Sequence, residues 1–441
     1  MLSQDDASRL AEIDRGTAIG DLLRRYWMPI AAVSELDRQP IRPVRVLGED
    51  LVLFKDRRGQ LGLLDRWCPH RRFDLAFGTV EDCGLRCSYH GWRFDEAGAC
   101  LEQPFEEAHQ PGSTFKDKVR TTSYPVQVLG GLIWAYLGPA PAPLVPDWAG
   151  FYTPGYTVVS FLHMPCHWLQ IMEGFYDPVH VEWLHDRWSY RLHGKEVPDT
   201  RPRHTDFRWI DFDYGVVFQR RLEGADQWLA DRTVVFPNID GAGGQGWYLT
   251  WLVPVDATNT LVVYRLTITN WKTPFGQVVI APKSEFTQAE IPCHRTRATL
   301  DADRGLTDDM GSHLISQDVA AWLGVGPLVD RTRERLSASD AGVIMFRRQL
   351  LEQARIVREG GDPLGTIRLA EKNRRITLPG PRKNYGLHGE GLPGMVGDDD
   401  VMLRAFLPFD LPADIKASIN EAMSNLVRGR RPATWKKKGR V

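Results

Sequence analysis

Two short segments in the first quarter of the chain each pair a cysteine with a histidine. The first holds Cys68 and His70, the second holds Cys87 and His90, and residues 71–86 separate them. Thiolate and imidazole are common metal ligands, so the two segments predict a metal site. A structural zinc site usually groups like ligands together, whereas here each segment mixes the two types. Mixed segments suit a centre with two irons, in which the cysteines bind one iron and the histidines bind the other.

Such a centre is the Rieske [2Fe-2S] cluster, whose imidazole ligands raise its reduction potential. The segments Cys-Pro-His-Arg at 68–71 and Cys-Ser-Tyr-His-Gly-Trp at 87–92 closely resemble the pattern of the Rieske domain family. We therefore expect the two cysteines and two histidines to bind a [2Fe-2S] cluster. Hydroxyl or backbone groups of Ser88 and Tyr89 are expected to donate to the sulfurs. A structural zinc protein remains an alternative.

A second group of possible metal ligands lies further along the chain, in the segment EGFYDPVHVEWLHDRW at 173–188. It holds Asp177, His180 and His185. Histidines five positions apart lie about 140° apart on an ideal α-helix, so both reach one ion only where the helix is distorted. Asp177 before a proline is also a good helix N-cap. The spacing alone therefore leaves both a metal site and an ordinary helix start open.

The two groups together resemble the Rieske non-haem iron oxygenases, in which D-x-x-H-x-x-x-x-H follows the Rieske motif. The resemblance implies that His180, His185 and one carboxylate bind a mononuclear Fe(II), with one side open for dioxygen and substrate. Composition leaves five carboxylates in the right part of the chain: Asp308, Asp309, Asp318, Asp330 and Asp340. The segment ISQDVAAWLG at 315–324 resembles the phthalate dioxygenase and aryl O-demethylase branch, in which the aspartate of Gln-Asp is the ligand. This resemblance implies Asp318.

The family's chemistry implies a terminal oxygenase component that receives electrons one at a time. Dioxygen is kinetically inert toward closed-shell organic molecules, so a store of single electrons is needed beside the iron. NAD(P)H on a separate reductase, with or without a ferredoxin, is the implied source. The chain has no convincing G-x-G-x-x-G fold opener, so we expect the nicotinamide to bind elsewhere.

The resemblance also gives Asp177 a role between the two metal sites. In the family, its counterpart hydrogen-bonds an iron-ligating histidine and a Rieske histidine of another subunit, which would join His180 to His90. The expected assembly is a homotrimer, closed by rotation. The family commonly has Asn after Glu173, where this chain has Gly174, so a hydrogen bond near the iron is missing or supplied from elsewhere.

The expected reaction is hydroxylation or O-demethylation of a carboxylated or methoxylated aromatic compound, as in the dehydrodivanillate demethylase-like branch. The resemblance rests on four pairs of residues: Gln317-Asp318, Gly326-Pro327, Asp330-Arg331 and Arg347-Arg348. Two alternatives remain: cis-dihydroxylation of an aromatic acid such as a phthalate, and a Rieske electron-transfer protein without oxygenase activity. Arg203, Arg220 and Arg221 are candidates to bind a substrate carboxylate, and none is preferred.

The pattern of apolar residues predicts an α+β protein made of an all-β Rieske domain and a larger α+β catalytic domain. A helix is expected over Ala7–Asp14, a β-meander from Val44, and a helix of about five turns after Ser339. The catalytic domain is expected to hold a central antiparallel sheet flanked by helices. The proline-rich connector GPAPAPLVPDW separates the domains. The predicted division is 1–40 (N-terminal helical segment), 41–146 (Rieske domain) and 147–441 (mononuclear iron domain).

Charge and composition exclude several classes of protein. The 55 basic and 56 acidic residues nearly cancel, so we expect neither nucleic acid nor a membrane as partner. The N-terminus has no apolar signal region and no apolar run approaches the roughly 18 residues of a spanning helix, so we expect a cytoplasmic protein. Six cysteines in 441 residues make no disulfide framework.

Overall fold

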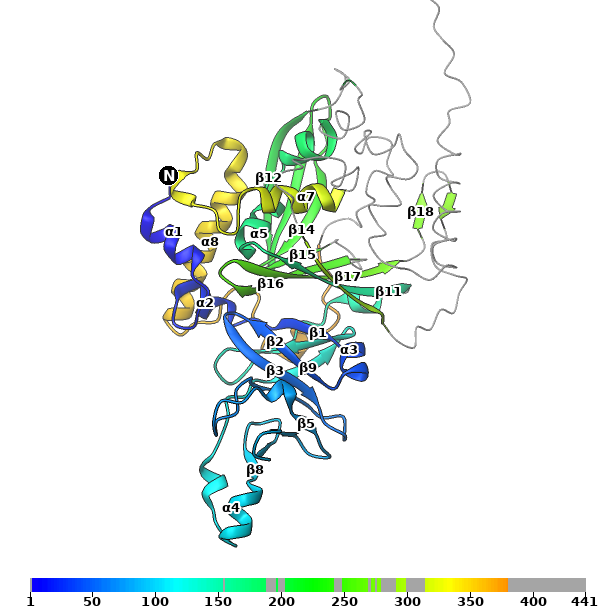
Figure 1. Ribbon diagram of the computed structural model, residues 1–441. Coiled ribbons are helices and arrows are strands. Elements are labelled where there is room, and N and C mark those ends of the chain that lie inside the picture. The colour runs from blue at the N-terminus through cyan, green and yellow to red at the C-terminus, as the bar shows by residue number, and fades with distance from the viewer. Residues whose placement is uncertain are drawn as a thin grey trace, which may run out of the picture.

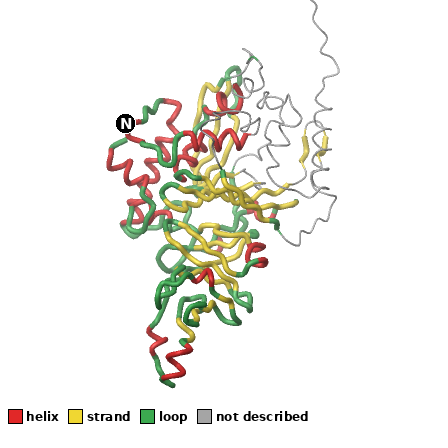
Figure 2. The backbone as a smooth tube through the Cα atoms, viewed as in Figure 1, coloured by secondary structure: helices red, strands yellow, loops and turns green. Residues whose placement is uncertain are grey.

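The computed structural model describes residues 2–153, 155–187, 196, 203–241, 248–268, 271–273, 276–278, 291–298 and 314–379. A smaller body of short strands and loops lies below a larger body built around one long sheet (Figure 1). Strands dominate both bodies, and the longer helices gather on the larger one (Figure 2). The predicted fold class is confirmed. The candidates Asp308 and Asp309 lie outside the described residues.

The N-terminal helices lie beside the larger body. They are α1 (Gln4–Ala11) and α2 (Ala18–Leu23). The predicted helix over Ala7–Asp14 forms three residues earlier, because the side chain of Ser3 accepts a hydrogen bond from the backbone of Asp6 and caps the helix there. Both helices contact α8 (Ala341–Arg358), the predicted long helix, which Figure 1 shows next to them.

The smaller body contains three small antiparallel sheets. The predicted meander is confirmed as β2 (Ile41–Val46), β3 (Glu49–Lys55) and β4 (Leu61–Asp65). A second sheet has the order β1 (Met28–Ala32), β10 (Leu132–Ala135), β9 (Val126–Leu129). The third has the order β5 (Thr79–Val80), β6 (Leu85–Arg86), β7 (Arg93–Phe94), β8 (Cys100–Glu102). Short helical segments connect these strands: α3 (Val33–Arg38), η1 (Leu75–Phe77), α4 (Pro104–His109) and η2 (Phe115–Lys118).

The larger body is built on an eight-stranded sheet. Its strands, in spatial order, are β12 (His204–Phe212), β13 (Gly215–Leu222), β14 (Leu229–Val235), β15 (Ile239–Gly241), β16 (Tyr248–Asp256), β17 (Asn259–Ile268), β11 (Tyr156–Met164) and β20 (Cys293–Arg297). Neighbouring strands run antiparallel except β11 and β20, which are parallel. A separate hairpin pairs β18 (Trp271–Thr273) with β19 (Gly276–Val278).

Helical elements cover this sheet and carry the second group of candidate ligands. They are η3 (Ala149–Tyr152), α5 (Trp168–Tyr176), the π-helix η4 (Val181–Arg187), α7 (Leu314–Gly324), η5 (Arg331–Arg333), η6 (Ala338–Asp340), α8 and η7 (Ala370–Lys372). α5 lies against β16 and contacts both α7 and α8. Among the described helices, none combines the length and the apolar character needed to cross a bilayer.

The two bodies are bound together by backbone and side-chain hydrogen bonds. Arg265, on β17 of the larger sheet, is buried and donates to the carbonyl oxygens of Gly130, Gly150 and Phe151, each at 3.0 Å. Gly130 precedes β10 of the smaller body, and the other two lie in η3 after the proline-rich connector. One guanidinium therefore joins the sheet, the connector and the smaller body. The predicted domain boundaries stay predictions, and β1 pairs with β10 although it precedes residue 41.

Replacing Arg265 with Met should lower the free energy of unfolding by about 3 kcal/mol, because three buried carbonyl groups lose their donor. Urea denaturation followed by tryptophan fluorescence measures this loss. The exposed Arg335, replaced in the same way, serves as control and should change the stability by less than about 0.5 kcal/mol. Equal effects of the two substitutions would show that Arg265 does not bind the bodies together.

Candidate metal centres

The four predicted cluster ligands lie together in the smaller body, although two come from the loop after β4 and two from the loop after β6. The thiols of Cys68 and Cys87 are buried and hydrogen-bond each other. The rings of His70 and His90 meet edge to face with centroids 4.5 Å apart. The structure therefore brings together two sulfurs and two imidazoles from separate loops.

Backbone N–H groups surround the sulfurs of this group. The hydrogen bond from Cys68, opposed by burial and assisted by the N–H groups of Tyr89 and His90, lowers the pKa of Cys87 to about 6. The hydroxyl of Ser88 donates instead to the carbonyl oxygen of Phe77 at 2.6 Å. Apart from the Cys68 thiol, the donors at this sulfur are therefore backbone groups, and Ser88 does not contribute its hydroxyl.

One unsatisfied atom indicates that these two cysteines and two histidines fit a [2Fe-2S] cluster. His70 Nδ1 is shielded from solvent and has no hydrogen-bond partner among the described residues. A buried ring nitrogen is costly to leave unpaired, and a bound iron would satisfy it. The ring is held in place by Trp92, which stacks on it with centroids 4.4 Å apart and planes 7° apart.

The second group of candidate ligands lies where α5 gives way to a π-helix. α5 ends at Tyr176, with Asp177 as its C-cap, and η4 begins at Val181. A π-helix has i→i+5 hydrogen bonds and a wider turn than an α-helix, so residues five positions apart lie nearer to the same face. The rings of His180 and His185 accordingly lie edge to face with centroids 5.1 Å apart. The local distortion that the five-residue spacing requires is present.

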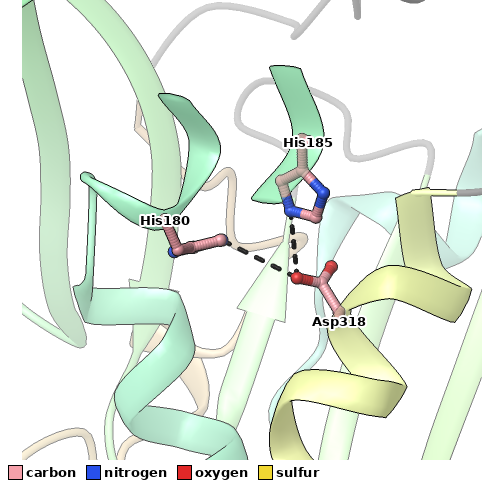
Figure 3. Close-up of side chains that lie close together, drawn as sticks. All are labelled: His180, His185 and Asp318. Carbon is pink, nitrogen blue, oxygen red and sulfur yellow. Dashed lines mark ion pairs between the residues drawn. The ribbon is translucent and has the colours of Figure 1, made fainter. Parts of the chain in front are cut away.

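The two imidazoles meet the carboxylate of Asp318, which comes from α7 (Figure 3). Asp318 Oδ1 lies 3.0 Å from His185 Nε2 and 3.7 Å from His180 Nε2. One ligand atom from each of the three side chains lies within 4.8 Å of the others. Two imidazoles and a carboxylate so close together can hold one metal ion.

The outer nitrogen of each imidazole faces an oxygen atom. His185 Nδ1 donates to Gln317 Oε1 at 2.9 Å, and its Nε2 lies on the side of Asp318. His180 Nδ1 lies 3.5 Å from Asp177 Oδ2. Such contacts orient metal-binding imidazoles and fix their tautomer. In the sequence, Gln317 is marked only as part of a motif, and its contact with His185 depends on the fold.

Asp318 is poised to stay ionised. Burial raises its pKa, but His185, His180 and Arg232 lower it further than burial raises it, so the pKa lies below its usual value. Asp177 behaves similarly: burial raises its pKa, and contact with His180 together with the backbone N–H of Val179 lowers it below the usual range. Both carboxylates are therefore negative at neutral pH.

Comparisons with known proteins agree with this geometry. A model of the Rieske [2Fe-2S] domain matches residues 26–125, and a model described as LigXa C-terminal domain like matches residues 307–377. The chain is 42% identical over 394 residues to the 5,5'-dehydrodivanillate O-demethylase oxygenase subunit of Sphingobium sp. (strain NBRC 103272 / SYK-6), covering 88% of this chain and 89% of that one.

The chain belongs to the Rieske non-haem iron oxygenases. It is a terminal oxygenase component, like the phthalate 4,5-dioxygenase oxygenase subunit of Pseudomonas putida, to which it is 30% identical over 83% of its length and 89% of the relative's. The solved structure of NdmA from Pseudomonas putida CBB5 shares the fold, with a TM-score of 0.55, 19% identity and coverage of 78% of this chain and 94% of that one.

The remaining carboxylates proposed for the oxygenase's iron have other partners where they are described. Asp330 caps η5 by accepting hydrogen bonds from Thr332. Asp340 accepts from the backbone N–H of Ser337. Neither belongs to the group of His180, His185 and Asp318. Of the five candidates, Asp318 is the one that the described structure brings to the histidines.

The arginines considered for a substrate carboxylate lie on or near the strands after η4. Arg203 is exposed, Arg221 pairs with Asp206 at 2.8 Å on the surface, and Arg220 contacts His204 Nε2 at 3.0 Å. The structure adds Arg232, on β14, whose guanidinium lies 5.1 Å from the ring centroid of Phe175. Its charge acts on Asp318. No sequence pattern marked Arg232, because its place beside the candidate iron site depends on the sheet.

A buried ionic cluster anchors α5 of the oxygenase. The carboxylate of Glu173 accepts from Arg331 through Nε and Nη2, each at 3.1 Å, and from Arg347 Nε at 2.7 Å. Arg347 also donates to Glu334 at 2.6 Å. Burial raises the pKa of Glu173, and the two arginines lower it below the usual value, so the carboxylate is ionised. The Asp-Arg and Arg-Arg pairs noted in the sequence thus place arginines against α5.

Gly174 permits the close approach of α7 to α5. A Cβ atom at this position would lie 2.6 Å from Nε1 of Trp322, a buried residue of α7. An asparagine side chain, common here in the family, would therefore collide with this indole. The neighbouring Gln170 donates to the carbonyl oxygens of Trp322 and Gly326 at 2.9 and 2.8 Å. Trp322 fills the place beside Gly174.

Gly174→Ala should lower the free energy of unfolding by about 1–3 kcal/mol, because the new methyl group forces the Trp322 indole out of its place. Combining it with Trp322→Phe, which removes the indole nitrogen, should cost less than the sum of the two single substitutions by at least about 0.5 kcal/mol. Urea denaturation of the four proteins in this cycle measures the coupling. Strict additivity would mean that the indole does not occupy the space beside Gly174.

Proposed function

We propose that His180, His185 and Asp318 bind a mononuclear Fe(II), and that Cys68, His70, Cys87 and His90 bind the [2Fe-2S] cluster. The observation that carries the iron site is the convergence of three ligand atoms within 4.8 Å from η4, the segment before it, and α7. When bound, the cluster supplies single electrons and the iron activates dioxygen for insertion into a substrate. Three protein ligands leave coordination positions free for dioxygen and substrate.

We infer that the substrate is a methoxylated or carboxylated aromatic compound and that the reaction is hydroxylation or oxidative O-demethylation. Support comes from the relative named as a 5,5'-dehydrodivanillate O-demethylase oxygenase subunit. The relative named as a phthalate 4,5-dioxygenase oxygenase subunit favours cis-dihydroxylation of an aromatic acid as the second candidate. A role in electron transfer alone would need no second metal site, and the three converging side chains argue against it.

The electrons are proposed to come from NAD(P)H through a separate reductase, in the cytoplasm. The candidate iron ligands lie around α5 and α7 in the larger body. The strands β5 and β8, beside the cluster loops, lie in the smaller body, toward the opposite end of the molecule (Figure 1). Electron transfer from the cluster to the iron within one chain would have to cross this distance. We therefore propose a homotrimer in which the cluster of one subunit serves the iron of its neighbour, with Asp177 joining His180 to His90 of that neighbour.

Purified protein with a compatible NADH-dependent reductase should convert methoxylated aromatic acids with release of formaldehyde, in a panel that also contains phthalates and benzoates. Asp318→Ala should keep the visible absorption of the cluster, lose the third iron per chain and lower turnover by more than about 100-fold, since loss of a ligand exceeds the usual cost of losing a residue that only orients one. The exposed cap Asp330, replaced by Ala, is the matched control.

Formaldehyde measurement, product mass and metal analysis decide between the candidate functions. A product heavier by two oxygens and two hydrogens, without formaldehyde, would replace demethylation by cis-dihydroxylation. If the protein has a reducible cluster but no third iron and takes up no oxygen, electron transfer would be its only function.

Asp177→Ala should leave both metals in place and abolish coupled turnover, because electrons no longer pass between the two sites. Stopped-flow absorbance of the reduced cluster, mixed with dioxygen and substrate, should show a slower oxidation by about 100-fold. Asp177→Asn can still accept a hydrogen bond from the N–H of Val179. Comparing it with the alanine variant therefore distinguishes loss of the local turn from loss of the bridge between the two metal sites. Retained activity in the alanine variant would refute the bridge.

A further inference from the structure

A network of three polar side chains joins the π-helix to two strands of the large sheet. Glu182 lies in η4, His204 begins β12, and Arg220 lies on β13. Glu182 Oε1 accepts hydrogen bonds from the backbone N–H and from Nδ1 of His204. His204 Nε2 lies 3.0 Å from Nη1 of Arg220. The network therefore ties the helix that carries His185 to two neighbouring strands.

The direction of these hydrogen bonds follows from the arginine. A guanidinium donates and cannot accept, so Nε2 of His204 accepts from Arg220 and the ring proton lies on Nδ1, which faces Glu182. Arg220 thereby favours the tautomer with which His204 donates to the carboxylate. The side chain of His204 is 3% exposed and that of Glu182 is 13% exposed, so water competes little for these bonds.

Glu182 also closes the turn of η4 that contains His185. Its backbone carbonyl oxygen accepts from Nη1 of Arg187, the last residue of η4, at 3.0 Å. One side of the turn is thus bound to β12 through the carboxylate, and its end is bound back to Glu182. A separate contact, with Gln317 of α7, holds the His185 imidazole itself. Because π-helices are rare, the contacts that stabilise this one are candidates for a role at the iron site.

We propose that Arg220 and His204 are positioning residues for the iron site. Through Glu182 they hold η4 in its π-helical form and so keep the imidazoles of His180 and His185 close together. The inference rests on the iron ligands proposed above, and neither residue is one of the three. In an α-helical turn the two imidazoles would point apart, and a misplaced ligand weakens metal binding.

Arg220→Met removes the donor to His204 and keeps a side chain of similar length. Ferrous iron should bind to this variant about 10-fold more weakly than to the parent, when titrated anaerobically into protein whose mononuclear site has been emptied, without substrate or reductase. Arg221→Met is the matched control, because Arg221 is the next residue on β13 and pairs with Asp206 at 2.8 Å on the surface. It should leave the iron affinity unchanged.

Two further variants separate positioning from general stability. Arg220→Lys keeps a donor and should restore most of the affinity. His204→Asn places an amide nitrogen near the position of Nδ1, so it can still donate to Glu182 but no longer reaches Arg220. Adding Arg220→Met to this variant should therefore cause no further loss of iron affinity, because the arginine acts through the histidine.

The electron paramagnetic resonance spectrum of the nitric oxide complex of the bound iron reports the ligand geometry. It should change in Arg220→Met and match the parent in Arg221→Met. Equal iron affinities of the parent and Arg220→Met, equal losses in the two methionine variants, or an undiminished loss in the His204→Asn background would overturn the role of Arg220. A parent protein that binds no third iron would instead overturn the proposed iron ligands.

Discussion

The relative position of α5 and α7 is the constraint on which the candidate iron site depends. Glu173 fixes α5 by binding two buried arginines, one from η5 and one from α8. A buried carboxylate that lost one of these partners would be left with uncompensated charge, so the three segments are held together firmly. Gln170, one turn before Glu173, binds the end of α7. The histidines follow from α5 and the aspartate comes from α7, so these contacts set the distance between the ligands.

The π-helix after α5 turns a sequence spacing into a ligand geometry. In an α-helix, residues 180 and 185 would diverge, and the second imidazole would leave the site. The widened turn is supported from outside by Glu182, whose carboxylate contacts His204 and whose carbonyl oxygen accepts from Arg187. The strand β12, which carries His204, therefore shares in shaping the candidate iron site although none of the three candidate ligands lies on it. The π-helical distortion is part of the candidate site, and the contacts of Glu182 with His204 and Arg187 support it.

Ligand type and spacing are local properties of the sequence. For this reason the sequence identified the four residues of the cluster loops. It also identified His180, His185 and Asp318, which the structure brings together. Asp318 needed a resemblance as well, because several aspartates were equally possible by composition. The contacts of Gln317, Trp322 and Arg232 depend on helices and strands far apart in sequence, and no periodicity records them. Gly174 was noticed as a departure, but its reason appears only when α7 is seen beside it.

The two cluster cysteines lie in a small apolar core, distinct from the large core, which runs from α1 to α8 and also includes residues of β1, β3 and β10. Ten buried side chains, including Val52, Phe54 and Phe94, form the small core. Separate cores can loosen separately, and a part with few buried contacts opens at lower free energy than the whole. Oxidative destruction of the cluster would then affect this part first, and the remainder of the molecule would keep its fold but lose its supply of electrons.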